Sequence, residues 1–367
     1  MYIYEKNKLK LTTLQVVFNA GSLYEKEGRY GTMHLMEHLI CKSFSDMQSM
    51  LKKEGISWNA YTSDEHVVFY WSGLDSHLTP ELKRMLVDRI LGNIDMISVE
   101  SFTNERSTVL QEYGDSFNDP QSGKCLNVLR EKFNYYAPIG KRVDVNNFTI
   151  DDMREVKLEF FSKPARIIEV GPTKTDFSQI KYEEYRHEFK TLKFKQAHAS
   201  ELEEIYKGDK TCVICIGNKL IKKSDYPFLE IAFLMLSSGL ESALYQEIRV
   251  KRGLSYYSRA YSVPLINESI YIFSACTENK RVDELKNVYS EIIENVDKYL
   301  TEDRFNNIIS SLNIRNETKK ILRYDNMRDL TRKDCIQLPK NINKITFDKV
   351  VGAAKKYINQ KNMVIVC

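Results

Sequence analysis

One short segment constrains this chain more than any other: His34-x-x-Glu37-His38. If the segment is helical, His34 and His38 lie one turn apart and share a face, which suits two imidazole ligands on one Zn²⁺. Glu37 follows His34 by three residues, so its carboxylate reaches the same region. Two nitrogen ligands beside a carboxylate that need not bind the metal are the components of a zinc hydrolase. The alternative is an ordinary helix with two hydrogen-bonded histidines.

Length and composition indicate a folded protein with two domains. The chain has 367 residues, of which 43% are hydrophobic and 28% charged, and this length suits two domains of ordinary size. It contains no apolar run of about 18 residues, so we predict no transmembrane helix and no membrane partner. The first residues form neither an apolar signal core nor an Arg- and Ser-rich amphipathic stretch. We therefore expect the protein to stay where it is made, in the cytoplasm.

Charge and cysteine content exclude two further classes of protein. The 54 basic and 50 acidic residues give a net charge of +4, and no basic stripe carries interleaved aromatics, so we expect no nucleic-acid partner. The seven cysteines are an odd, scattered number, typical of reduced thiols. Cys212-x-x-Cys215 is a possible redox or metal motif, but it lies in an apolar β-like run. We favour a buried strand in which cysteine packs as a small hydrophobe.

Apolar periodicity predicts a similar set of elements in each half of the chain. In the first half we expect a strand at 11–20, a helix around His34 with Thr32 as its N-cap, an edge strand within 55–71, a strand at 165–171, and helices at 44–53, 80–97, 99–113, 125–133 and 149–161. In the second half we expect strands at 211–216, 256–263, 269–276 and 363–367, and helices at 226–236, 282–299, 302–315 and 347–357. A further helix in this half should end near Lys251.

These patterns favour an α+β fold with two related domains, each a mixed, largely antiparallel sheet packed against helices. The predicted domains cover residues 1–172 and 207–367. The connector between them, residues 173–206, is rich in Lys, Glu and Tyr, which indicates a solvated segment.

Further segments accompany the zinc motif in a fixed order. They are Ala20-Gly21-Ser22 with Glu25, Asn59-Ala60-Tyr61-Thr62-Ser63 with Glu65, Glu105-Arg106 with Val109-Leu110-x-Glu112, Asp119-Pro120, and Leu244-Tyr245-Gln246-Glu247-Ile248-Arg249 with Arg252-Gly253-Leu254 and Tyr256. Together these segments resemble the pitrilysin/insulinase family of inverted-zincin metallopeptidases, whose zinc motif reads His-x-x-Glu-His. The resemblance spans nearly the whole chain and is closest to the two-domain, processing-peptidase-like members, each of which is half of the family's clamshell.

The resemblance implies a complete zinc site. Glu112 stands at the distance from His38, and in the Val-Leu-x-Glu context, at which the family carries its third ligand. By that match His34, His38 and Glu112 hold one Zn²⁺ per chain. Glu37 would activate the zinc-bound water and pass the proton to the leaving amine. Glu105 would support the site from behind the ligands, and its alternative is a plain surface residue.

The resemblance also implies substrate-binding residues. Arg249 and Tyr256 match the pair that the family brings from its other half, and a cation with a phenol can stabilise the oxyanion of a scissile peptide. Their alternatives are a solvated helix residue and a core aromatic. The segment Asn59-Ala60-Tyr61 resembles the edge strand to which substrate adds as a further β-strand, and its alternative is an ordinary strand start.

The sequence thus predicts a zinc-dependent endopeptidase, a hydrolase that cleaves peptides or unfolded polypeptide in a closed chamber. Because one chain carries both halves of the site, we expect a homodimer, with a heterodimer of related subunits as the alternative. Two other functions stay open: a non-catalytic, peptide-binding subunit, and a maturase that trims one precursor. The segment Cys41-Lys42-Ser43-Phe44 replaces the family's Phe-Lys-Gly-Thr, which bears on substrate preference and not on the metal chemistry.

Overall fold

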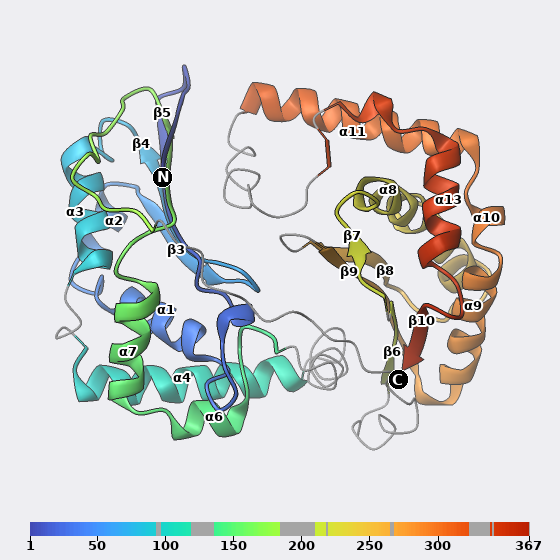
Figure 1. Ribbon diagram of the computed structural model, residues 1–367, viewed down its shortest axis with the longest axis horizontal. Helices are drawn as coiled ribbons and strands as arrows, with labels where there is room; N and C mark the ends of the chain where they lie inside the picture. The colour runs from blue at the N-terminus through green and yellow to red at the C-terminus, as the bar shows by residue number, and fades with distance from the viewer. Residues whose placement is uncertain are drawn as a thin grey trace. The chain divides into compact units, whose positions relative to one another are not determined.

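The structure, a computed structural model, describes residues 1–92, 97–118, 136–183, 210–217, 219–264, 268–322, 338–339 and 341–366. The chain forms two compact units, the first built mainly from residues 1–115 and 136–183 and the second mainly from 210–321 and 341–366. Each unit has a sheet with helices packed against it (Figure 1). The limits given above for the domains and the connector remain predictions, because residues 184–209 lie outside the described part.

The first unit is organised around a five-stranded sheet in the order β1-β5-β2-β4-β3. Its strands are β1 (Tyr2–Lys6), β2 (Leu11–Phe18), β3 (Ser57–Thr62), β4 (Val67–Leu74) and β5 (Arg166–Gly171). Strands β1 and β5 pair in parallel, and the other pairs are antiparallel. The central strand β2 is buried from its second residue to its last, including the polar residues Thr12, Thr13 and Gln15. Strand β3 pairs with β4 and forms one edge of the sheet.

The core of the first unit lies between one face of this sheet and the helices. Leu14, Val16 and Phe18 of β2 point into it, whereas Val17 joins a smaller cluster on the opposite face. This alternation is the two-residue period of a strand. The helices are α1 (Thr32–Lys42), α2 (Gln48–Lys53), α3 (Pro80–Leu91), α4 (Val99–Asn118), α6 (Arg142–Asn147) and α7 (Ile150–Phe160), with a 3₁₀ turn at Ser22–Tyr24. Helix α1 packs against β3, β4 and α7. The helix predicted at 125–133 lies outside the described residues.

The second unit has a sheet in the order β10-β6-β9-β7, with β8 also paired to β9. Its strands are β6 (Lys210–Gly217), β7 (Ile221–Lys222), β8 (Ser258–Pro264), β9 (Glu268–Glu278) and β10 (Met363–Val366). Its helices are α8 (Tyr226–Ser237), the π-helix η4 (Tyr245–Val250), α9 (Val282–Glu294), α10 (Val296–Tyr299), α11 (Glu302–Leu322) and α13 (Phe347–Tyr357), with 3₁₀ turns at Asn279–Arg281 and Ile342–Lys344. The single helix predicted at 282–299 is broken at Asn295.

The two units repeat one connectivity. Strand β2 pairs with β4, the second strand of the β3–β4 hairpin, and with β5, a later strand of its unit. Strand β6 pairs in the same way with β9, the second strand of the β8–β9 hairpin, and with the final strand β10. All of these pairs are antiparallel. The predicted fold class, two related α+β domains with largely antiparallel sheets, is confirmed.

The two cysteines of Cys212-x-x-Cys215 do not face a common ligand. Both lie on β6, and residues three apart on a strand point to opposite faces of the sheet. Cys212 lies opposite Cys276 of β9, with 2.7 Å between the two Sγ atoms, and Cys215 is part of the hydrophobic core. The motif therefore agrees with the buried strand that we favoured. Among the described helices, none is long and apolar enough to cross a membrane.

Candidate metal centre

The helix that carries the histidines begins at a glycine that no other residue replaces without strain. Gly31 is the N-cap of α1 and has φ of 105°, a backbone conformation that favours glycine. A Cβ atom here would lie 2.8 Å from a methyl of Val145 and 3.2 Å from Cα of Gly140. The helix start therefore packs directly on α6 and on the loop before it.

A buried carboxylate from outside the helix caps its free N–H groups. Glu25 accepts hydrogen bonds from the backbone N–H of Gly31 at 2.9 Å and of Met33 at 2.8 Å. The prediction that Thr32 is the cap is wrong, because Thr32 is the first helical residue and its hydroxyl also reaches Glu25, at 3.3 Å. Carboxylates near a helix N-terminus stabilise it. Burial raises the pKa of Glu25 to about 8, and its N–H partners act in the opposite direction.

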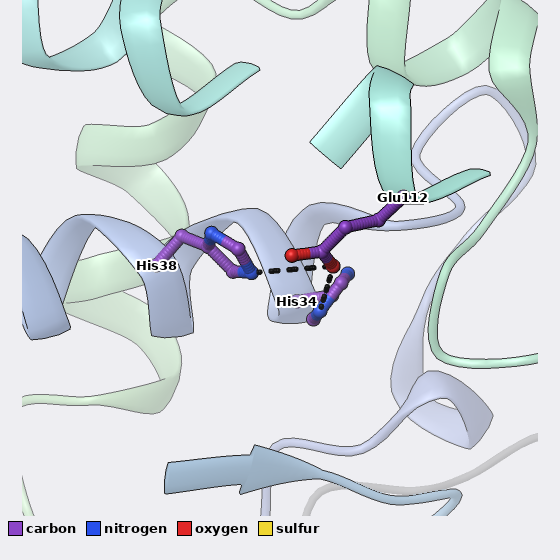
Figure 2. A group of neighbouring side chains, drawn as sticks. All are labelled: His34, His38 and Glu112. Atoms are coloured by element: carbon purple, nitrogen blue, oxygen red, sulfur yellow. Dashed lines mark ion pairs between the residues drawn. The ribbon is translucent and has the colours of Figure 1, made fainter. Parts of the chain in front are cut away.

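Three of the predicted residues converge on one point. The Nε2 atoms of His34 and His38 each lie 3.6 Å from Oε2 of Glu112, and Figure 2 shows the two rings of α1 facing this carboxylate, which comes from α4. One ligand atom from each residue lies within 4.8 Å of the others, the one such group of metal-binding type found among the described residues. The predicted ligand set is thus brought together by two helices.

The spacing of these atoms fits a metal ion better than a set of hydrogen bonds. A distance of 3.6 Å exceeds a normal N–H···O contact. Bonds of about 2.0–2.2 Å at tetrahedral angles place the ligand atoms of zinc about 3.4 Å apart. The Glu112 side chain is 45% exposed, so the cluster is open to solvent. These three residues therefore fit Zn²⁺ and would hold it at a site that solvent can reach.

The protonation states also fit a metal. Burial and the neighbouring His38 lower the pKa of His34 to about 3, so this ring is neutral at neutral pH and offers a lone pair. His38 donates from Nδ1 to Oε2 of Glu105 at 3.3 Å, when that nitrogen carries the proton. This tautomer leaves the Nε2 lone pair directed at Glu112. Glu105 thus contacts a proposed ligand and not the proposed ion. The Nδ1 atom of His34 is buried and has no hydrogen-bond partner among the described residues.

Glu37 lies beside this group without belonging to it. It is 8% exposed, and its Oε2 accepts a hydrogen bond from the Thr62 hydroxyl at 2.7 Å. Burial and the nearby Glu112 raise the pKa of Glu37. A carboxylate of raised pKa is suited to accept and return a proton near neutral pH. The sequence motifs include Thr62 and Glu25, but they did not predict the hydrogen bond from Thr62 to Glu37 or the capping of α1 by Glu25.

The predicted substrate strand, β3, is the last strand in the order of the first sheet among the described residues. Asn59 and Tyr61 of β3 are exposed, and Ala60 between them is half-buried. The Ala60 N–H donates to the Asn59 side-chain oxygen at 2.9 Å, a partner on β3 itself. An edge N–H of this kind is available to an added strand once the asparagine side chain turns away.

Arg249 and Tyr256 form a stacked pair in the second unit. The guanidinium of Arg249 lies 4.1 Å from the centre of the Tyr256 ring and 5.1 Å from that of Tyr245. Tyr256 is 81% exposed, so the alternative of a core aromatic is wrong. Arg249 is carried by the π-helix η4, a distortion that occurs often at functional sites.

Comparisons with known proteins agree along both halves of the chain. The insulinase family (peptidase family M16) matches residues 2–133, and the peptidase M16 inactive domain matches residues 148–312. An uncharacterised zinc protease of Streptomyces coelicolor is 24% identical over 334 residues, 83% of this chain and 71% of the relative. The beta subunit of the Homo sapiens mitochondrial-processing peptidase is 33% identical over 113 residues, 29% of this chain and 22% of that subunit. The crystal structure of a protease from Helicobacter pylori has a TM-score of 0.75 at 17% identity, covering 100% of this chain and 96% of that one.

Proposed function

Because the chain belongs to the peptidase M16 (insulinase) family, we propose that it is a zinc-dependent endopeptidase acting on peptides or unfolded polypeptide. The observation that carries this proposal is the group of His34, His38 and Glu112, whose ligand atoms lie within 4.8 Å of one another. Family members that serve only as binding subunits are expected to lack part of such a set. Here all three ligand residues and Glu37 are present, which favours catalysis over a purely structural role.

The proposed chemistry divides between the ion and the chain. Zinc at this site would supply a Lewis acid that polarises the scissile carbonyl and makes water more acidic. Glu37, buried beside the ligands, takes the proton from the attacking water and returns it to the leaving amine. Glu105 holds the His38 ring by its second nitrogen, which keeps the ligand oriented.

The substrate is proposed to bind as a strand along the edge of β3. The Asn59 side chain would release the Ala60 N–H, and the peptide carbonyl would take its place. Main-chain hydrogen bonds of this type hold a peptide largely independently of its sequence. Arg249 and Tyr256 are proposed to stabilise the oxyanion, because the pair is preassembled and its phenol ring is exposed.

We further propose a homodimer that encloses the substrate in a chamber in the cytoplasm. The sequence contains no histidine after His198, so a second His-x-x-Glu-His cannot occur in the second domain. The peptidase M16 inactive domain matches residues 148–312. One chain nevertheless carries both the ligand set and the Arg249–Tyr256 pair. Two identical chains therefore contain everything that the proposed site requires. The alternative is a heterodimer, which the name of the mitochondrial subunit suggests for that relative. A mass measurement of the purified chain in solution distinguishes the two: a homodimer has twice the mass of the chain, and a chain that needs a different partner stays monomeric.

The test combines metal analysis with peptide mapping. The purified protein, loaded with zinc and freed of excess metal, should hold one zinc ion per chain and cut a mixed peptide library, with products read by mass spectrometry. Glu112→Ala should lose both zinc and cleavage, whereas Gln111→Ala, at the exposed neighbouring position, should keep both. Full zinc occupancy in Glu112→Ala would remove Glu112 from the ligand set. Cleavage of a single precursor with no cuts in the library would identify a maturase.

A further inference from the structure

We infer that Thr62 is a positioning residue that ties the edge strand β3 to the base Glu37. A peptide added to β3 and the carboxylate that acts on it would then be held in a fixed relation to each other. The inference rests on the proposed function, since it assigns Thr62 a task in that same reaction.

The contact joins two elements that carry different parts of the proposed site. Thr62 is the last residue of β3, and its Oγ1 donates to Oε2 of Glu37, on α1, at 2.7 Å. Hydrogen bonds to a carboxylate are among the stronger ones in proteins. The bond occupies one carboxylate oxygen and leaves Oε1 for proton transfer. It also limits rotation of the carboxylate, which is a requirement for a base that acts on one bound water.

The direction of the Thr62 side chain follows from the pattern of its strand. Along β3, exposed residues alternate with half-buried ones, and Trp58, Ala60 and Thr62 are the half-buried set. Trp58 and Ala60 pack against the core that includes α1, so Thr62 points to the same side. Threonine is β-branched and therefore stiff at χ1. The strand thus presents the hydroxyl in a defined direction toward Glu37.

The backbone directly after Thr62 is held by two further hydrogen bonds, both at Ser63. Within the hairpin, Ser63 N–H donates to the His66 carbonyl at 2.7 Å. The turn is also held by Ser22 N–H, which donates to the Ser63 carbonyl at 3.2 Å. A Cβ atom at Gly21 would lie 2.3 Å from the Asp64 carbonyl carbon, so only glycine permits this close approach. The segment that holds Thr62 is therefore pinned where β3 ends.

The test separates the hydroxyl from the shape of the side chain. Thr62→Val removes the donor and keeps the β-branched shape, whereas Thr62→Ser keeps the donor. With the zinc-loaded protein and one library peptide, Thr62→Val should lower kcat by about 10-fold to 100-fold, the loss typical of outer-shell residues at metal sites. KM, zinc content and Tm should stay at wild-type values. Thr62→Ser should restore most of kcat. Ser57→Ala, which removes a hydroxyl from the other end of β3, is the matched control and should change none of these quantities.

Three outcomes would overturn the role of Thr62. Wild-type kcat in Thr62→Val would show that the hydroxyl is not needed, and the proposed function would stand. A loss of zinc or a lower Tm in Thr62→Val would show a structural role. If the wild-type protein cleaves no peptide, the proposed function fails and takes this inference with it. Peptide binding can also be measured without turnover. The peptide Kd of Glu37→Gln should equal that of the double variant Glu37→Gln/Thr62→Val.

Discussion

The Nδ1 atom of His38 lies 3.3 Å from Oε2 of Glu105, while the other ring nitrogen lies 3.6 Å from Glu112. Both carboxylates come from α4, and they contact opposite nitrogens of one ring on α1. Glu105 thereby selects the tautomer whose lone pair is directed into the ligand group. The two helices form the site as a unit, in which α4 supplies one proposed ligand and orients another.

Removing Glu105 should weaken zinc binding without abolishing it. Glu105→Ala leaves the three ligand atoms in place but frees the His38 ring, so we expect zinc affinity to fall by about 10-fold to 100-fold. Competition with a chelator of known affinity measures the change. Glu100→Ala, at an exposed position of the same helix, is the matched control. Equal zinc affinity in the two variants would make Glu105 a plain surface residue.

The Arg249–Tyr256 pair should matter for turnover and not for metal binding. Removing one stabilising group from an oxyanion site typically costs about 10²-fold to 10³-fold in kcat, and we expect a loss of this order in Arg249→Ala. Zinc content should be unchanged. Arg259 stacks on Tyr257 at 4.1 Å in the same geometry, so Arg259→Ala is the matched control. A similar loss of kcat in both variants would point to general damage in the second domain.

The stability of the first domain should depend on pH through Lys157. Its side chain is 7% exposed, and burial lowers the pKa of its ammonium group from 10.5 to about 8. Between pH 8 and 10.5 the unfolded chain holds this proton and the folded chain has released it. The free energy of unfolding therefore increases as pH rises from about 8 to 10.5, and it decreases again as pH falls back through the folded pKa.

Lys157→Met isolates this contribution from that of other titrating groups. We expect the variant to be more stable than the wild type at pH 7 by about 1–3 kcal/mol, with the difference shrinking toward pH 10.5. Urea unfolding at a series of pH values measures it. A difference in unfolding free energy that stays constant across this range would mean that Lys157 keeps an ordinary pKa in the fold.

Local spacing was enough to predict the parts of the site that lie on single elements. The placement of His34 and His38 on one face follows from the helical repeat. Strands β2 and β6 were predictable because both are buried on both faces, which places apolar residues at consecutive positions, residues 16–18 in β2 and residues 212–216 in β6. Glu112 required more than spacing, since its approach to the histidines depends on how α4 packs, and the family resemblance supplied it.

Contacts between distant segments could not be read from the sequence. Glu25 caps α1 from across a loop. Sequence patterns indicate only caps next to the helix start, and they pointed to Thr32. Strand β1 was missed because Tyr2–Lys6 pairs with β5, more than half of the first domain away along the chain. Thr62 was visible as part of a motif, but its bond to Glu37 depends on the packing of β3 against α1. Each of these is a tertiary relationship with no local periodic signal.

The most direct measurement is zinc content and peptide cleavage in one sample of Glu37→Gln. The substitution keeps the size of the side chain and removes its ability to accept a proton. Since Glu37 lies beside the ligands and is not one of them, we expect one zinc ion per chain, as in the wild type, and no detectable cleavage. Turnover near the wild-type rate in the zinc-loaded variant would contradict the assignment of Glu37 as the base, and with it the proposed reaction.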